Sequence, residues 1–398
     1  TKRARQTGAF VCYTNIVGGQ DELVFDGGSL VVNPQGKIIA RARQFEEDLL
    51  TVSLECHCER NEMKRSNLLN SKEIASSPRR PALTTAGQEA WLLAMTQRVT
   101  VPPLLEPTAE VYQALVLGTR DYVRKNGFQK VVIGLSGGID SALVALIARD
   151  ALGPDNVIGV TMPSKFSSPE TQSDTKVLAK NLSIKVIEVP IGEIFEAYLS
   201  TLKKEFAQTP FGAAEENIQA RIRGNILMAF SNKFGWLVLT TGNKSEIAVG
   251  YCTLYGDMSG GFALVKDVPK TKVYDLSRFR NAQEKTPLIP ESILDRAPTA
   301  ELRENQKDQD SLPPYEILDP ILKSYVEEHH SFEQVLKESA RKKNTADSQD
   351  IPRMIKDVIR LVDKSEYKRR QAPPGIKITP RAFGKDWRLP ITNGYKEF

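Results

Sequence analysis

This chain of 398 residues lacks several common features, and each absence argues against a class of protein. It has no run of eighteen apolar residues and no recognisable signal peptide, so we expect neither a membrane span nor contact with a membrane. Its basic residues exceed its acidic ones by only 54 − 49, or +5, which argues against a nucleic-acid partner. Its four cysteines form no disulfide framework, and this favours a cytoplasmic location.

Two of the cysteines flank a histidine, in Cys56-His57-Cys58, and such a group can suggest zinc. The two thiols are too close in sequence for the usual Cys-x2–4-Cys ligand spacing. No partner pair at ligand spacing occurs elsewhere in the chain. We therefore expect no zinc site.

Composition and pattern divide the chain into three parts, which we expect at residues 1–60, 61–103 and 104–398. The first part has short β-like runs, including a hairpin around Asn33-Pro34-Gln35-Gly36 and a strand at 48–58. The second part is polar and basic, which is typical of a linker, with one helix near 87–98. The third part alternates strand and helix patterns.

This alternation predicts an α/β fold: a doubly wound parallel sheet covered by helices on both faces. Ligands of such sheets bind beyond the carboxyl ends of the strands, at the point where the strand order reverses. The expected strands are 131–135, 157–162, 184–189 and 236–241, and the expected helices are 108–126, 142–152, 191–206, 213–234 and 271–283, with a further helix starting at Ser168.

The most informative stretch is Ser136-Gly137-Gly138-Ile139-Asp140-Ser141, which joins the first of these strands to a helix. Glycines at such a junction let backbone N–H groups point at an anion, and the helix dipole adds positive potential there. The serine hydroxyls add donors, and Asp140 is placed to bind a Mg²⁺ ion on bound phosphates. The stretch therefore predicts a phosphate-binding turn.

This motif resembles the PP-loop of the ATP pyrophosphatases, which cleave ATP to AMP and pyrophosphate while they adenylate a substrate. It is not a Walker loop, because no Gly-Lys-Ser/Thr follows the glycines. The resemblance implies ATP as co-substrate, with its phosphates held by Gly134, Leu135, Ser136, Gly137, Gly138, Ile139, Asp140 and Ser141.

Later stretches narrow the resemblance to the glutamine-dependent NAD⁺ synthetases. They are Asn217-Ile218-Gln219-Ala220-Arg221, Thr240 to Glu246, Tyr255 to Gly261, Ala297 to Leu302 and Glu366 to Arg370. The family converts deamido-NAD to NAD⁺ in two steps, adenylation by ATP and attack by ammonia. The resemblance thus implies a ligase that forms a C–N bond.

The resemblance also implies roles for individual residues. Thr241, Lys270 and Thr299 match positions that contact ATP, and Asn217, Arg221, Glu246 and Lys368 match positions that bind deamido-NAD. Asp140 and Glu246 would hold Mg²⁺, and Asp140 and Lys270 would be catalytic. Judged without the resemblance, Lys270 is more typical of a solvated surface lysine.

Three positions depart from the small ammonia-dependent enzymes: Leu254 replaces a lysine, Gly261 an acidic residue and Tyr367 a histidine. The contacts to deamido-NAD in the loop 254–261 are therefore not carried over. Members of the family that this sequence resembles form homo-oligomers, so the resemblance implies a homo-oligomer here.

The run from Asn15 to Ser29 resembles the closing part of a nitrilase-type glutaminase domain, whose Glu, Lys and Cys come earlier in the chain than this run. We therefore expect that a glutaminase half is largely missing and that this chain uses free ammonia instead of glutamine. Cys12 has no nucleophile motif around it and is expected to be a buried core residue.

Other functions stay open at this point. Another PP-loop amidating enzyme or a tRNA thiolase is possible, but a thiolase needs paired cysteines near the loop, and Cys252 stands alone. A nucleotide-binding pseudoenzyme would have lost Asp140 or Glu246, and both are present. A purely structural oligomerisation unit would not need the intact PP-loop donors.

Overall fold

The computed structural model describes residues 1–54, 101–304, 306–341 and 351–392. The Cys56-His57-Cys58 group, the helix expected near 87–98 and most of the linker expected at 61–103 lie outside these residues. The chain forms two compact units. One comprises Thr1–Val17 and Asp26–Leu104, and the other comprises Gly18–Phe25 and Leu105–Phe398.

The first unit contains a three-stranded antiparallel sheet in the order β1 (Val11–Tyr13), β4 (Leu30–Val32), β5 (Ile38–Arg41). The hairpin between β4 and β5 was predicted, and Gly36 makes its turn with a φ of 79° while its N–H donates to the Asn33 carbonyl at 2.8 Å. A helix, α1 (Lys2–Thr7), precedes the sheet and was not predicted.

Two expectations about this unit are wrong. Cys12 is exposed and not a core residue, and among the described strands β1 lies at the edge of its sheet, beside β4 alone. The strand expected at 48–58 is absent from its described part, residues 48–54, which have no regular structure. Among the described residues, no strand lies beside 48–54 to pair with it, and a strand needs such pairing to form.

The second unit contains a five-stranded parallel sheet, and it confirms the predicted fold class. Its order is β10 (Phe262–Ala263), β9 (Leu237–Thr240), β6 (Val131–Gly134), β7 (Val157–Thr161), β8 (Lys185–Glu188). The chain runs outward from β6 to β8 and then returns to the other side of β6 with β9. The order therefore reverses between β6 and β9, which is where such sheets bind ligands.

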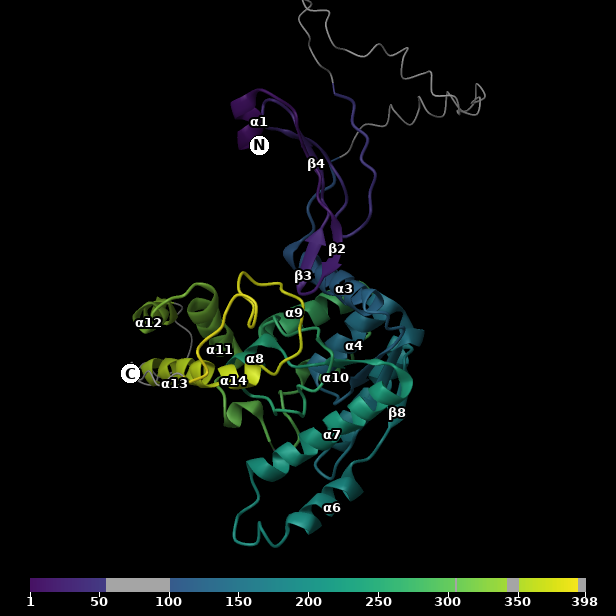
Figure 1. The fold of residues 1–398 in the computed structure, drawn as a ribbon, viewed down its shortest axis with the longest axis vertical. Coiled ribbons are helices and arrows are strands. Elements are labelled where there is room, and N and C mark those ends of the chain that lie inside the picture. Colours follow the sequence, from purple (N-terminus) through teal and green to yellow (C-terminus); the bar gives the residue numbers. More distant parts are fainter. Residues whose placement is uncertain (55–100, 305, 342–350, 393–398) are drawn as a thin grey trace, which may run out of the picture. The chain divides into compact units, whose positions relative to one another are not determined.

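Alternate residues of β6 pack against different helices, as the strand period of two requires. Val131 and Ile133 join a core with α3 (Pro107–Lys125), α4 (Ile139–Leu152) and α9 (Lys270–Asn281). Val132 joins a second core with α6 (Gly192–Leu202) and α7 (Ala213–Phe234), which run beside each other in Figure 1. The central strand is thus buried on both faces.

The helix boundaries differ from expectation at two places that matter. α4 begins at Ile139 and not at Ala142, so Asp140 and Ser141 lie in its first turn. α6 ends at Leu202 and not at 206, because only Phe195 of this helix is buried and its last turn has little to pack against. α5 (Pro169–Leu182) is capped by Ser168 as expected, with the serine Oγ accepting from the Thr171 N–H at 3.1 Å.

A separate core of apolar side chains joins most of the remaining helices. These are α8 (Lys244–Val249), α11 (Tyr315–Leu322), α12 (Phe332–Arg341) and α13 (Ile351–Lys364), while the short α10 (Glu291–Asp295) packs with the sheet helices. The short α14 (Glu366–Arg369) follows α13. Within the described part of the chain, no helix is both long and apolar enough to cross a membrane.

The hairpin of β2 (Val17–Gln20) and β3 (Leu23–Asp26) contributes residues Gly18–Phe25 to the second unit. The Gly19 N–H donates to Asp121 at 2.8 Å, and the Lys125 ammonium donates to the Gly19 carbonyl at 2.6 Å, so both partners lie on α3. A Cβ added to Gly118 of α3 would lie only 2.9 Å from Cγ2 of Val24. The absence of a side chain at Gly118 therefore lets the hairpin lie close against α3.

We expect Gly118→Val to lower the free energy of unfolding by ~1–3 kcal/mol, the range for overpacking a core. The new side chain would meet both Val24 and Ile376, whose Cδ1 lies 2.8 Å from the added Cβ. Gly192→Val at the start of α6 is the control, because nothing lies within 4 Å of its added Cβ. Urea unfolding of both variants measures the effect, and equal losses at the two positions would contradict the prediction.

Candidate active site

The PP-loop connects β6 to α4, and its two serines hold it in shape. Ser141 Oγ donates to the Gly138 carbonyl at 2.9 Å and accepts from the Ser136 N–H at 3.3 Å. Gly137 has a φ of 77°, and a Cβ there would meet Cγ2 of Thr171 at 2.4 Å, so only glycine fits. Gly138 is the N-cap of α4, and no described side chain caps this end. The first-turn N–H groups are thus available to an anion.

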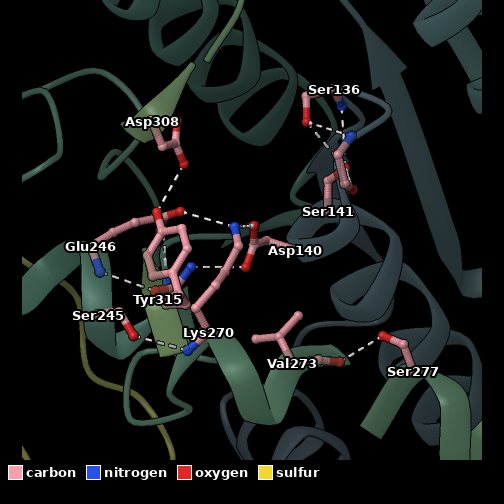
Figure 2. Close-up of polar contacts among 12 residues, drawn as sticks. Ser136, Asp140, Ser141, Ser245, Glu246, Lys270, Val273, Ser277, Asp308 and Tyr315 are labelled. Carbon is pink, nitrogen blue, oxygen red and sulfur yellow. Dashed lines mark hydrogen bonds and ion pairs between the residues drawn. The ribbon is translucent and has the colours of Figure 1, made fainter. Parts of the chain in front are cut away.

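The centre of the site is an ion cluster of two carboxylates and one ammonium group (Figure 2). Lys270 Nζ donates to Asp140 Oδ2 and to Glu246 Oε1, the latter at 3.3 Å. The Lys270 side chain is only 3% exposed, so the interpretation of a solvated lysine is wrong. Buried lysines need anionic partners. Here they come from α4 and α8, which are far from Lys270 in sequence.

Asn243 ties the two carboxylates together from the other side. It is the N-cap of α8: its Oδ1 accepts from the Glu246 N–H at 3.0 Å, and its Nδ2 donates to Asp140 Oδ1 at 2.9 Å. The Glu246 carboxylate in turn accepts from the Asn243 N–H at 3.4 Å, which completes a capping box. The cap therefore sets the positions of Asp140 and Glu246 relative to each other.

The close approach of these groups changes their ionisation. Burial, together with the nearby charge of Asp140, raises the pKa of Glu246 to about 8 although the Lys270 ammonium opposes this. Burial alone would lower the pKa of Lys270, but Asp140 and Glu246 outweigh burial and raise the pKa well above its ordinary value. Lys270 therefore stays a cation in this site.

Tyr315 and Asp308 extend the cluster, as Figure 2 shows. The Tyr315 hydroxyl donates to Asp308 Oδ2 at 2.8 Å, and the Lys270 ammonium lies 5.3 Å from the centre of the Tyr315 ring. Burial raises the pKa of the Asp308 carboxyl above its usual range. A buried cation over an aromatic face is stabilised by the ring quadrupole.

Two adjoining cavities of about 170 and 270 Å³ lie along the PP-loop. The smaller one brings together the expected ATP-contacting residues Thr241, Lys270 and Thr299 with Asp140 and Glu246. The larger one is lined by Gly134, Leu135 and Ser136, and by Arg223. The Arg223 Nε donates to the Met162 carbonyl at 3.2 Å. The residues Ser136, Thr241 and Thr299 line both cavities.

The other expected substrate residues all contact one segment, Gly250–Leu254, which follows α8. Thr253 Oγ1 donates to Asn217 Oδ1 at 2.6 Å, Arg221 Nε donates to the Leu254 carbonyl at 3.2 Å, and Lys368 Nζ donates to the Gly250 and Cys252 carbonyls at 2.7 and 2.8 Å. These three residues do not line either cavity, but Cys252 in the segment they contact does.

The C-terminal end of α8 is held by α14. Ser365 Oγ donates to the Val249 carbonyl at 3.0 Å, and Arg369 Nη1 donates to the Ala248 carbonyl at 2.6 Å. Donors and cations at this end satisfy the carbonyls that a helix leaves unpaired. Arg369 is itself paired with buried Glu366 at 3.0 Å. Both ends of the helix that carries Glu246 are therefore anchored.

The carboxylates fit a magnesium site. Asp140 and Glu246 offer hard oxygen ligands, the type that Mg²⁺ prefers, and their oxygens already converge on one cationic group. They also face the cavity that the PP-loop lines, where phosphates could supply the remaining ligands.

Cys252 lies on the wall of the same cavity but is a poor nucleophile. Burial raises the pKa of its thiol to about 12, and the neighbouring Asp257 adds to the shift. The reactive form of cysteine is the thiolate. The Cys252 side chain is therefore protonated near neutral pH.

Asn243, Asp308, Tyr315 and Arg223 were not predicted as site residues. The pattern Asn243-x-x-Glu246 is a capping-box sequence and could have indicated the first of them. Asp308 and Tyr315 reach the cluster from a distant part of the chain, and no local pattern marks them.

Family models match two parts of the chain. The model described as NAD synthase matches residues 111–372, which is more than half of the chain, and the model described as carbon-nitrogen hydrolase matches residues 1–58. The first match contains the PP-loop, Glu246 and Lys270, and the second contains the expected glutaminase remnant.

Proteins similar to this chain agree with the longer match. The glutamine-dependent NAD(+) synthetases of Aquifex aeolicus and Thermotoga maritima are 52% and 50% identical over 99% and 97% of this chain. The chain spans 66% and 65% of the lengths of these two relatives. The structure of the glutamine-dependent NAD+ synthetase from Acinetobacter baumannii in complex with ADP is 40% identical, with a TM-score of 0.63 over 99% of this chain and 64% of that one. The chain belongs to the NAD synthase family.

Proposed function

We propose that this chain amidates deamido-NAD to NAD⁺ at the expense of ATP, through an acyl-adenylate intermediate. One observation carries the proposal: the Asp140–Lys270–Glu246 cluster lines the same cavity as the PP-loop, Thr241 and Thr299. A phosphate cradle beside a paired-carboxylate cluster suits the transfer of an adenylyl group with pyrophosphate as the leaving group.

In the first step, an oxygen of the pyridine carboxylate attacks the α-phosphorus of ATP. The bond from this phosphorus to the oxygen that bridges to the β-phosphorus breaks, and pyrophosphate leaves with both electrons of that bond. The N–H groups at the start of α4 and the hydroxyls of Ser136 and Ser141 would bind the phosphates, and Lys270 would neutralise charge on the leaving group.

In the second step, ammonia attacks the acyl carbon of the adenylate. The C–O bond to AMP breaks, AMP leaves, and the new amide nitrogen loses a proton. Water would take up this proton, because Glu246 is the proposed metal ligand and a carboxylate bound to a divalent ion is a poor proton acceptor.

Mg²⁺ would be held by Asp140 and Glu246, and when bound it supplies positive charge to the pyrophosphate oxygens. Asn243 would hold the two carboxylates at a fixed distance from each other, because it donates to both. The anchoring of α8 at its far end by Arg369 would limit movement of Glu246.

Deamido-NAD would be bound by Asn217, Arg221, Glu246 and Lys368. Its carboxylate and two phosphates call for such donors. In support, Asn217, Arg221 and Lys368 all contact the segment Gly250–Leu254, and Cys252 of this segment reaches the cavity.

The nitrogen would come from free ammonia in this chain and from glutamine in a longer protein. Cys12 lies exposed on an edge strand, and the Cys252 thiol is protonated, so neither is suited to attack glutamine. We also propose a homo-oligomer in the cytoplasm, on the strength of the family and of the cysteine usage.

Asp140→Asn should slow pyrophosphate release by roughly 10²-fold or more, the scale of losing one preorganised electrostatic contact. The assay follows pyrophosphate with deamido-NAD, ATP and Mg²⁺. Asp155→Asn is the control, because this exposed residue follows α4 far from the cluster. A rate near that of the unmodified chain would remove Asp140 from the mechanism.

Arg221→Ala should raise the KM for deamido-NAD by roughly tenfold or more while the KM for ATP stays nearly unchanged. Lys233→Ala, on the exposed end of the same helix, should change neither value. Nicotinate mononucleotide should be a poor substrate, because it lacks the second phosphate and the adenosine. Parallel increases in both KM values would mean that Arg221 supports the fold and does not bind substrate.

Ammonia should support NAD⁺ formation by this chain, and the rate should increase with pH because only unprotonated ammonia is nucleophilic. Glutamine should not replace it. The two donors are compared on the unmodified chain, Cys12→Ala and Cys252→Ala. Glutamine-supported turnover that either substitution abolishes would refute the assignment, and turnover with neither donor in a folded chain would mean that further residues are needed to complete the site.

A further inference from the structure

Lys270 occupies the point on which the two proposed metal ligands converge. Its ammonium group donates to Asp140 Oδ2 and Glu246 Oε1 at once, and the side chain is almost fully buried. The same two carboxylates are the Mg²⁺ ligands of the proposed function. The structure thus shows a protein cation at a place assigned to a metal cation.

The two cations exclude each other at this place. Mg²⁺ needs carboxylate oxygens at about 2.0–2.1 Å, whereas the ammonium nitrogen already lies within hydrogen-bond distance of both oxygens. An ammonium and a divalent ion a few ångströms apart in a buried site repel each other strongly. Asn243 already donates to the second oxygen of each carboxylate, so metal bound by both carboxylates requires that Lys270 Nζ move away.

The backbone of Lys270 is fixed, and its side chain borders the smaller cavity. Its N–H donates to Ser245 Oγ at 2.9 Å, and Asp319 accepts from the Thr271 N–H at 2.9 Å, so the start of α9 is anchored. The side chain carries four rotatable carbons and lines the cavity that Ser136 and Ser141 also line. Phosphates in this cavity would offer the ammonium new anionic partners.

We propose that Lys270 is the resident cation of the divalent-metal site, and that it gives up this place to the metal by moving onto the nucleotide's phosphates. The inference rests on the proposed function. Metal alone would leave the Lys270 ammonium without an anion, and nucleotide alone would draw it off and leave two carboxylates unpaired. Either single event breaks a buried ion pair, which is costly, whereas both together leave every charge paired. Metal and nucleotide must therefore bind cooperatively.

A binding experiment with Mn²⁺ alone tests the first half of this proposal. Free Mn²⁺ is measured by electron paramagnetic resonance with the unmodified chain, Lys270→Met and Lys270→Arg. Without nucleotide, Lys270→Met should bind Mn²⁺ at least about tenfold more tightly than the unmodified chain, because a competing charge is gone. Lys270→Arg keeps the cation and should bind Mn²⁺ as weakly as the unmodified chain, and Lys272→Met, two residues further along α9, should also be unchanged. Equal affinity in the unmodified chain and Lys270→Met would overturn the proposal.

Acetylation of the unmodified chain tests the movement without any substitution. A short pulse of acetic anhydride, read by mass spectrometry, should leave Lys270 unmodified in the free chain, modify it when Mn²⁺ is saturating, and leave it unmodified again when Mn²⁺ and α,β-methylene-ATP are both present. Lys272 should react equally in all three conditions. Protection of Lys270 under saturating Mn²⁺ would overturn the proposal.

These results also separate this inference from the proposed function. If Mn²⁺ binds neither chain even with α,β-methylene-ATP, then Asp140 and Glu246 are not metal ligands, and both the metal assignment and the inference fail. If Mn²⁺ binds and activity is normal but Lys270 stays protected, then the proposed function stands and the inference alone is lost.

Discussion

The ion cluster of Asp140, Lys270 and Glu246 is the interaction on which the site depends, because it joins charged side chains from three different helices. Asp140 comes from the helix after β6, Glu246 from the helix after β9 and Lys270 from the helix after β10. The parallel sheet brings these starts of helices to one edge, and the charges then fix their spacing. Removing one member would leave unpaired charge in a buried place, so the cluster constrains fold and chemistry together.

The helix α8, which carries Glu246, is short and is held at both ends. A helix of this length has little stability of its own. Asn243 caps its start, and Ser365 and Arg369 bind the carbonyls at its end. The helix therefore depends on tertiary contacts, and these contacts present the Glu246 carboxylate at a defined place in the cavity wall.

Local sequence was enough to predict what is locally determined. The PP-loop turn, the helix Ala213–Phe234 and the parallel sheet follow from glycines, apolar periodicity and the order of strands. The burial of Lys270 could not be read from its neighbours, since its partners lie far away in sequence. The same holds for Tyr315 and Asp308. Cys12 was misjudged because an apolar-looking strand does not reveal whether it lies at the edge or in the middle of a sheet.

The hairpin Gly18–Phe25 limits how sequences from the two matched families can be exchanged between proteins. It lies within the carbon-nitrogen hydrolase match at 1–58. It nevertheless packs with α3 of the second unit, where Val24 lies against Gly118. The two matched segments are therefore not independent units that could be exchanged at a single junction. A hydrolase tail grafted from another source would have to bring a hairpin that fits this helix, so the two sequences are expected to have co-evolved across the junction.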